Sequence, residues 1–195
     1  MEEYKQLRSK VDAAFEKLFQ KHRSQINCTE GCHQCCAPRL TVSRVEADMI
    51  SAYLQDHPEV VESLREIKAQ NPHRGERCAM LNSEGMCSIY EVRPLICRSH
   101  GAPVLVQIDE KREGIDSCPL NFTEGMSSLE AGDWIHLETL NTMLVLIDWR
   151  YALDQGRTRP DPVADRVELS LQSLLHLGED SSVGERVIPN EEGKP

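Results

Sequence analysis

The sequence lacks the features of several large protein classes. Aromatic residues make up only 5% of its 195 residues and the formal net charge is −10, which argues against a surface of clustered Lys and Arg for nucleic acid. No apolar run approaches the roughly 18 residues of a membrane span, and MLVLI at 143–147 is among the longest. The N-terminus MEEYKQLRSK has no apolar segment typical of a secretory signal. We therefore expect a cytoplasmic protein that binds neither nucleic acid nor membranes, with any protein partner or substrate unknown.

Motifs of the common enzyme mechanisms are also missing. The chain has no G-x-S-x-G nucleophile motif, no P-loop, no dinucleotide fingerprint and no H-E-x-x-H zinc motif. It also has no internal repeat and no low-complexity segment. Any function must therefore be carried by another set of residues.

Amphipathic helical patterns surround a turn-rich middle segment. A Ser43–Glu46 capping box and Pro58 at a first helical position mark two helix starts. Residues 78–90 and 103–118 have the pattern of short strands joined by turns. Helices are expected over residues 2–25, 43–55, 58–70, 130–153 and 162–177.

The predicted fold class is α+β, mostly helical, with a loop- and hairpin-rich cysteine metal-binding core flanked by amphipathic helices. We expect a single domain over residues 1–178, with its cysteine core at 28–118, and a disordered tail over 179–195. The core is modest in apolar content, so ordinary packing is not expected to hold it. A thiolate-bound metal can, because structural zinc contributes about 10–16 kcal/mol of apparent binding energy to folding.

Eight cysteines characterise this core, four of them in the stretch CTEGCHQCC at 28–36. An even number would suit disulfides, but the expected compartment is reducing and disulfide scaffolds are usually smaller. Thiolates are soft ligands that select zinc, copper(I) or iron–sulfur centres. We therefore predict that all eight are metal ligands, in one or two centres: Cys28, Cys32, Cys35, Cys36, Cys78, Cys87, Cys97 and Cys118.

The adjacent pair Cys35–Cys36 is the unusual part of the pattern. Neighbouring side chains of an extended backbone point in opposite directions, so both reach one centre only if the loop bends. Either the two thiols serve different centres, or one of them is a supporting or redox thiol. The spacing of Cys28, Cys32 and Cys35 also occurs in radical enzymes that use S-adenosylmethionine. Those enzymes need repeated strand–helix units, which are not predicted here, so we interpret that match as coincidental.

Charged and imidazole side chains near the cysteines could support a metal centre. Arg39, Arg93 and Arg98 offer donors that could hydrogen-bond sulfur and offset the negative charge of a thiolate centre. His33 and His100 could ligate a metal, but the thiols already suffice. We therefore do not expect either histidine to be a ligand.

The combined cysteine pattern resembles a known family. CTEGCHQCC is followed by CAMLNSEGMCSIYEVRPLICR, which has the form C-x8-C-x2-Y-x2-R-P-x2-C-R. Together they resemble the CxxCxxCC (YkgJ-like) family of zinc- or iron-chelating cysteine-cluster domains, over about residues 28–118. One departure is the first gap, which holds three residues rather than two. The resemblance implies metal chelation by the cysteines, and we interpret Tyr90 and Arg93–Pro94 as a turn that aims Cys87 and Cys97 at one centre.

Two functions follow from these patterns. The first is a cytoplasmic metal-binding protein that chelates an iron–sulfur cluster, such as 4Fe–4S, or zinc. The second is an iron–sulfur-dependent redox or protein-modifying enzyme, because the cluster is similar to that of flagellin lysine methylases and Cys118–Pro119 echoes the end of some ferredoxin motifs. An iron–sulfur cluster is preferred to zinc, and the ligand set suits both.

Overall fold

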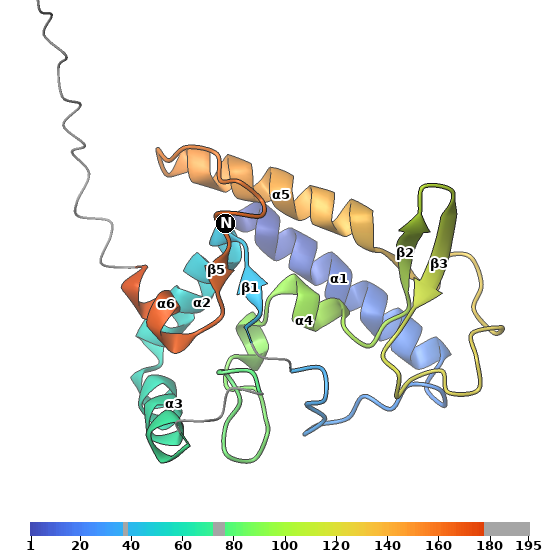
Figure 1. Ribbon diagram of the computed structural model, residues 1–195, viewed down its shortest axis with the longest axis horizontal. Coiled ribbons are helices and arrows are strands. Elements are labelled where there is room, and N and C mark those ends of the chain that lie inside the picture. The colour runs from blue at the N-terminus through green and yellow to red at the C-terminus, as the bar shows by residue number, and fades with distance from the viewer. Residues whose placement is uncertain (37–38, 72–76, 178–195) are drawn as a thin grey trace, which may run out of the picture.

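Helices predominate in the structure, a computed structural model that describes residues 1–36, 39–71 and 77–177 (Figure 1). The α+β, mostly helical class is confirmed. The expected tail at 179–195 lies outside the described residues. The helices are α1 (Glu2–Lys21), α2 (Arg44–Asp56), α3 (Pro58–Gln70), α4 (Leu95–Ser99), α5 (Leu137–Asp154) and α6 (Leu171–His176), with one 3-10 turn at Tyr90–Val92.

The strands are short and belong to two small sheets. β1 (Thr41–Val42) pairs antiparallel with β5 (Val167–Glu168), placing Val42 opposite Val167. β2 (Val104–Asp109) and β3 (Arg112–Asp116) form an antiparallel hairpin, and β4 (Ile135–His136) adds to β2 in parallel. The expected hairpin after residue 103 is therefore present.

Two helix starts follow directly from local sequence. The carboxylate of Glu46 accepts hydrogen bonds from both the backbone N–H and the hydroxyl of Ser43 at 2.9 Å, so the capping box forms at the start of α2. Pro58 is the first residue of α3, where its missing N–H costs nothing. Both predictions are confirmed.

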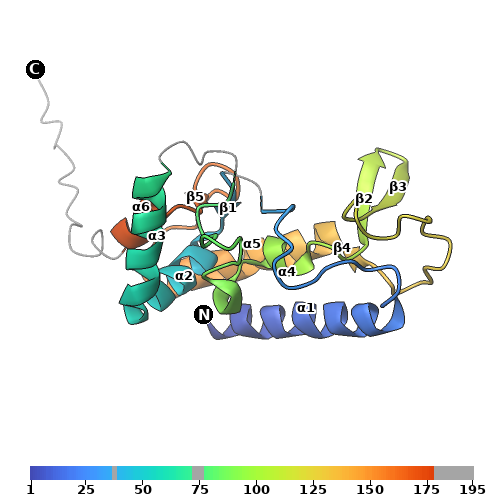
Figure 2. The same ribbon diagram turned by 90° about the horizontal axis from the view of Figure 1, so that it is seen from below.

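Three helices, which we call the helical frame, support the rest of the molecule: α1, α2 and α5. Figure 1 shows α1 and α5 running alongside one another, and Figure 2 shows α1 along one face, with α4 packed on it. Among the described residues, none of the helices is long and apolar enough to cross a membrane. The apolar cluster inside the frame consists of Tyr4, Leu7, Val11, Val45, Met49, Leu95, Leu140 and Leu144.

A polar contact fixes two of the frame helices to each other. Asp148 of α5 is buried and accepts hydrogen bonds from the backbone N–H groups of Val45, at 2.7 Å, and Arg44, at 3.3 Å. These are donors at the start of α2 that have no partner within the helix. A side chain of one helix thus caps another, which sets the angle between them.

Three predicted helices are shorter than expected, and the first of them, α1, ends at Lys21 rather than at residue 25. Residues 130–136 are not helical; Asp133 accepts a hydrogen bond from the N–H of Glu130 there, and β4 follows. Of 162–177 only α6 is helical, because Val167 and Glu168 pair with β1 and Ser170 then caps the helix by accepting from the N–H of Ser173. Helical spacing of apolar residues was present in both segments, but tertiary pairing overrode it.

Candidate metal centre

The loop that carries the first four cysteines curls through two tight turns. The N–H of Cys32 donates to the carbonyl of Thr29 at 3.1 Å, and the N–H of Cys36 donates to His33 at 3.0 Å. Gly31 adopts a φ of 81°, a conformation that side chains disfavour. No disulfide joins the eight cysteines, all of which lie among the described residues. In this loop Cys32 and Cys35 are exposed, whereas Cys28 and Cys36 are half-buried.

The second pair of cysteines stands on a hairpin that is joined to this loop. The N–H of Cys78 donates to the carbonyl of Cys36 at 3.0 Å. Leu81 and Cys87 form an antiparallel bridge, and Asn82 stabilises the turn by accepting from the N–H of Met86 at 2.8 Å. Cys78 and Cys87 are therefore brought to the same end of the molecule as Cys36.

Cys97 stands on α4, which a buried carboxylate holds in place. Glu46 accepts from the N–H of Leu95 at 2.9 Å and from the hydroxyl of Tyr4 at 3.2 Å, in addition to its bonds to Ser43. It is only 2% exposed and joins α1, α2 and α4. The sequence marked Glu46 only as part of a capping box, because its partners on α1 and α4 are distant in the chain.

Arg98 does not serve the thiols as the sequence suggested. Its guanidinium forms a salt bridge with Asp12 of α1 at 2.7 Å and donates to the carbonyl of Arg93 at 2.8 Å and to that of Glu91. These oxygen partners explain its burial. Arg98 thus fixes the turn before α4 to the helical frame, which positions Cys97 indirectly.

Arg93 is a cation whose charge acts on the thiols of Cys35, Cys87 and Cys97. Its guanidinium carbon lies 3.8 Å from the centre of the Tyr90 ring, in a cation–π contact. Its Nε atom is buried and has no hydrogen-bond partner. The pKa of Cys97 is raised to about 12, first by burial and then by the charges of Cys78, Cys87 and Cys35, while the charge of Arg93 opposes the shift.

The adjacent thiols of Cys35 and Cys36 interact with each other. Their hydrogen bond is the main reason why the pKa of Cys36 is lowered and that of Cys35 is raised. Burial and the charges of Cys78, Cys87 and Cys97 act on Cys36 in the opposite direction. Cys36 therefore lies among the thiols of the hairpin and α4.

Cys28 and Cys118 are held together at a different place. The side-chain amide of Asn121 donates to the sulfur of Cys28 at 3.4 Å and to the carbonyl of Gly101 at 2.8 Å, and its N–H donates to the carbonyl of Cys118 at 2.8 Å. Burial raises the pKa of Cys28, Asn121 lowers it, and the charges of Cys118, Cys32 and Cys35 raise it. Asn121 was missed from the sequence, where no spacing distinguishes it.

The thiols do not form a closed set of metal ligands in the structure. Among residues 1–36, 39–71 and 77–177, no three His, Cys, Asp or Glu side chains are gathered closely enough to hold a metal ion. His33 uses Nδ1 on the carbonyl of Gly31 at 2.9 Å, and His100 is exposed. The expectation that neither histidine is a ligand stays a prediction.

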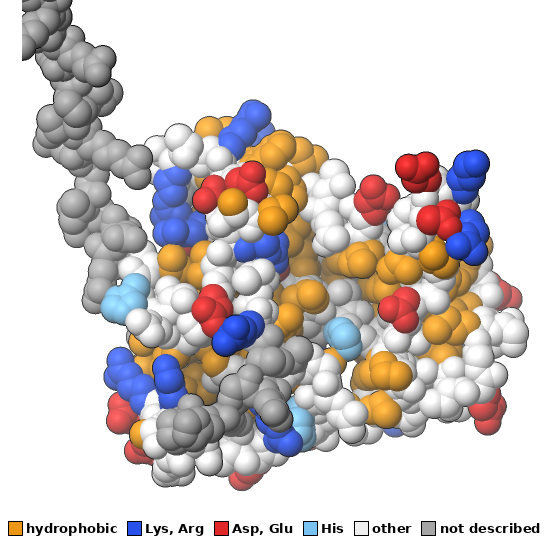
Figure 3. Space-filling model, viewed as in Figure 1, with side chains coloured by type: hydrophobic (Ala, Val, Ile, Leu, Met, Phe, Trp, Pro, Cys, Tyr) orange, Lys and Arg blue, Asp and Glu red, His pale blue; other side chains and the backbone are white. Residues whose placement is uncertain are grey.

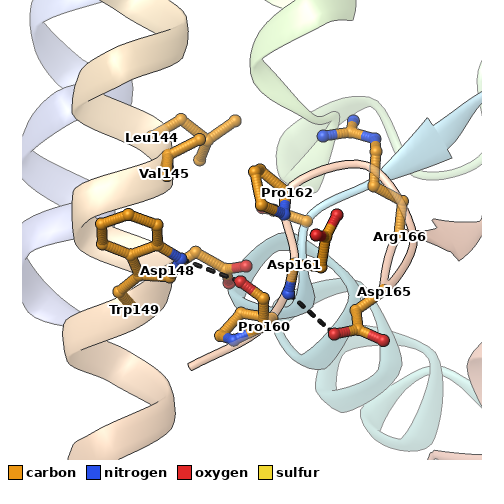
Figure 4. Close-up of a pocket in the computed structure, with 10 residues that line it drawn as sticks. Leu144, Val145, Asp148, Trp149, Pro160, Asp161, Pro162, Asp165 and Arg166 are labelled. Atoms are coloured by element: carbon orange, nitrogen blue, oxygen red, sulfur yellow. Dashed lines mark hydrogen bonds between the residues drawn. The ribbon is translucent and has the colours of Figure 1, made fainter. Parts of the chain in front are cut away.

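A separate pocket lies between α5 and residues 160–166 (Figure 4). The indole N–H of Trp149 donates to the carbonyl of Pro160 at 2.8 Å, and the N–H of Asp161 donates to Asp165 at 2.7 Å. The cavity volume is about 20 Å³, which is room for about one water molecule, and no cysteine lines it. These contacts attach the segment to α5, and the pocket is too small for a substrate.

Comparison with known proteins gives one match. Residues 27–119 match the model of the CxxCxxCC family, described as a putative zinc- or iron-chelating domain. This segment contains all eight cysteines and confirms the resemblance drawn from their pattern. No curated protein and no solved structure matches the chain.

Proposed function

Because residues 27–119 match the model of the CxxCxxCC family, we propose that the cysteines of this protein chelate a metal, as an iron–sulfur cluster or as zinc. The observation that carries the proposal is the inner thiol group, by which we mean Cys36, Cys78, Cys87 and Cys97. Cys36, Cys78 and Cys87 pack in one apolar cluster, and Cys97 stands on α4. Four thiolates are the usual ligand number of a structural zinc or a 4Fe–4S cluster.

The surroundings of the inner thiol group suit an anionic centre. A zinc ion with four thiolates has a net charge of −2, and an iron–sulfur cluster is anionic too. Arg93 brings a positive charge and a buried Nε–H donor that lacks an acceptor. A ligand sulfur would supply that acceptor, since charge-assisted hydrogen bonds to metal-bound groups are a common supporting contact.

An iron–sulfur cluster remains our preferred occupant, with zinc as the alternative. Either one would hold the loop- and hairpin-rich segment together, since metal-binding energy is realised as folding energy. We also keep the cytoplasm as the expected compartment, because a reducing environment keeps cysteines available as metal ligands. We do not propose nucleic-acid binding, because the Lys and Arg side chains on the face in Figure 3 form small separate groups among Asp and Glu.

The deciding experiment is purification under anaerobic conditions, followed by metal and acid-labile sulfide analysis and a visible absorption spectrum. We expect iron with equimolar sulfide and a brown protein. A colourless protein with stoichiometric zinc would show that zinc, and not an iron–sulfur cluster, is bound. Eight titratable thiols with no metal would overturn chelation.

A matched pair of variants on α4 tests the ligand assignment. Cys97→Ser removes a proposed ligand, whereas Ile96→Ser places the same side chain on the neighbouring position, which is 49% exposed. We expect Cys97→Ser to lose metal and Ile96→Ser to retain it. Full metal content in Cys97→Ser would show that Cys97 is not a ligand.

A further inference from the structure

We propose that Asn121 is a positioning residue of the metal site, which holds the sulfur of Cys28 in place and donates a hydrogen bond to it when that sulfur binds metal. Asn121 lies just after the segment 27–119 that matches the family model. The inference rests on the proposed function, with Cys28 as one of the ligands. It adds a residue that acts on a ligand sulfur and not on the metal itself.

The side-chain amide of Asn121 is buried, and both of its ends are bound. The residue is only 3% exposed. Its Oδ1 accepts from the backbone N–H of Asn27 at 2.8 Å. Its Nδ2 donates to the carbonyl of Gly101 at 2.8 Å and to the sulfur of Cys28 at 3.4 Å. Because one end meets an N–H and the other a carbonyl, the orientation of the amide is determined, and the sulfur receives an N–H donor.

The backbone around Asn121 is fixed to the end of α1. The N–H of Asn121 closes a turn on the carbonyl of Cys118 at 2.8 Å, and the N–H of Phe122 donates to the carbonyl of Gln25 at 2.8 Å. Phe122 is a member of the apolar cluster at the end of α1, and Cys28 packs against the same cluster. The amide is therefore held in place before any metal binds, as a positioning group must be.

An N–H donor at this sulfur favours its metal-bound form. A ligating cysteine is a thiolate, and hydrogen bonds to an ionised acceptor are roughly twice as strong as neutral ones. Contacts of this kind orient a ligand, and their loss lowers metal affinity about 10- to 100-fold in other sites. In iron–sulfur proteins, hydrogen bonds to the sulfurs also set the reduction potential. Asn121 can thus tune the centre without being a ligand.

Asn121→Asp removes the donor and preserves the rest of the contact. The new carboxylate still accepts from the N–H of Asn27, but it has no N–H for the sulfur of Cys28 and puts a negative charge beside it. In the full chain purified anaerobically, we expect metal affinity to fall about 10- to 100-fold in competition with a chelator. With an iron–sulfur cluster, a redox titration should also show a lower reduction potential. With zinc, cobalt(II) substitution should show a shifted thiolate-to-metal absorption band.

Asn27→Asp is the matched control. In the described part of the chain, the side-chain amide of Asn27 donates to the carbonyl of Leu120 at 2.5 Å and to no thiol. Asn27→Asp therefore removes an amide donor from the same junction and leaves the hydrogen bond to Cys28 in place. We expect it to keep wild-type affinity and spectrum. A loss equal to that of Asn121→Asp would show that only the junction matters, and would overturn the inference.

Gly101 gives a second test that leaves Asn121 unchanged. A Cβ atom at this position would lie 2.8 Å from the sulfur of Cys28 and 3.4 Å from the amide nitrogen of Asn121, so Gly101→Ala must disturb their contact. Gly125 has the same φ of 98°, but a Cβ there meets nothing within 4 Å, so Gly125→Ala reproduces the backbone strain alone. We expect Gly101→Ala to lose metal affinity and Gly125→Ala to keep it, with circular dichroism confirming that each variant is folded.

The remaining outcomes separate this inference from the proposed function. Metal-free wild-type protein would overturn chelation itself. A wild type that binds metal, together with unchanged affinity in Asn121→Asp, would leave chelation in place and overturn the role of Asn121. If Asn121→Asp does not fold, the two glycine variants decide, and wild-type affinity in Gly101→Ala would contradict the inference.

Discussion

The helical frame and the cysteine region use different means to stay ordered. Inside the frame, apolar side chains from α1, α2 and α5 pack together, and the buried carboxylates Glu46 and Asp148 have donors for their oxygens. The cysteines instead stand on the loop at 28–36, around the Leu81–Cys87 bridge, on α4 and at Cys118, and the buried Nε of Arg93 has no hydrogen-bond partner. The buried carboxylates of the frame are satisfied by protein donors, whereas we propose that the cysteines bind a metal.

Metal removal should produce the largest difference in amide hydrogen exchange between the two regions. Under reducing conditions a chelator should sharply increase hydrogen exchange of amides in the loop, the hairpin and α4, because metal binding contributes on the order of 10 kcal/mol to order there. Amides of α2 and α5 should remain protected. Mass-resolved hydrogen exchange checks this, and equal deprotection of all helices would contradict the division into two regions.

The largest single-residue effect is expected in the frame. Glu46→Ala leaves buried donors of Tyr4, Ser43 and Leu95 without an acceptor, so the free energy of unfolding should fall by roughly 3–5 kcal/mol. Glu46→Gln keeps one acceptor oxygen and should cost less. Urea unfolding followed by circular dichroism measures both variants, and a loss below about 1 kcal/mol in Glu46→Ala would refute this role.

A smaller effect is expected for the cation beside the inner thiol group. Arg93→Gln removes the charge and should weaken metal binding about 10- to 100-fold, as loss of a supporting contact does in other metal sites. Arg93→Lys keeps the charge and should lose less. Competition with a chromogenic chelator measures both affinities. If Arg93→Gln binds metal with wild-type affinity, Arg93 has only a structural role in the turn with Tyr90.

The smallest effect is a pH dependence at Asp148. Burial raises the pKa of this carboxyl above the ordinary Asp value of 3.8, although the N–H groups of Val45 and Arg44 oppose the shift. Its ionisation therefore costs stability as the pH rises through its folded pKa, and protonated Asp148 favours folding.

Asp148→Asn removes this titration and keeps an acceptor for Val45. Relative to this variant, the wild type should gain free energy of unfolding as the pH falls from 7 to 4, by about 1 kcal/mol or less. Paired urea titrations at the two pH values give the difference. A relative loss at low pH would mean that the hydrogen bonds outweigh burial.

The sequence predicted helix starts correctly where a few neighbouring residues determine them. Ser43 with Glu46 placed the start of α2, and Pro58 placed that of α3. Residues 130–136 and 162–170 were assigned wrongly because strand pairing and side-chain caps there depend on distant partners. Helical spacing carries no information about such partners.

The candidate site shows the same limit. The cysteines and Arg93 stood out because their spacing is local, and the family match covers all of them. The roles of Asn121 and Arg98 could not be predicted, since they bind residues of other segments, Cys28 and Asp12 among them. Four thiolates suit both zinc and an iron–sulfur cluster, so the cysteine spacing does not distinguish between them.

The pairing of β1 with β5 has a consequence for the order of events during synthesis. Arg166 donates to Thr41 across 125 positions of the chain, so β1 waits for its partner until almost all described residues have been made. The last cysteine precedes β5 by about 50 residues, which ribosomes add in a few seconds. All eight thiols are therefore synthesised before that contact can close, so the metal binding that we propose does not have to wait for β5.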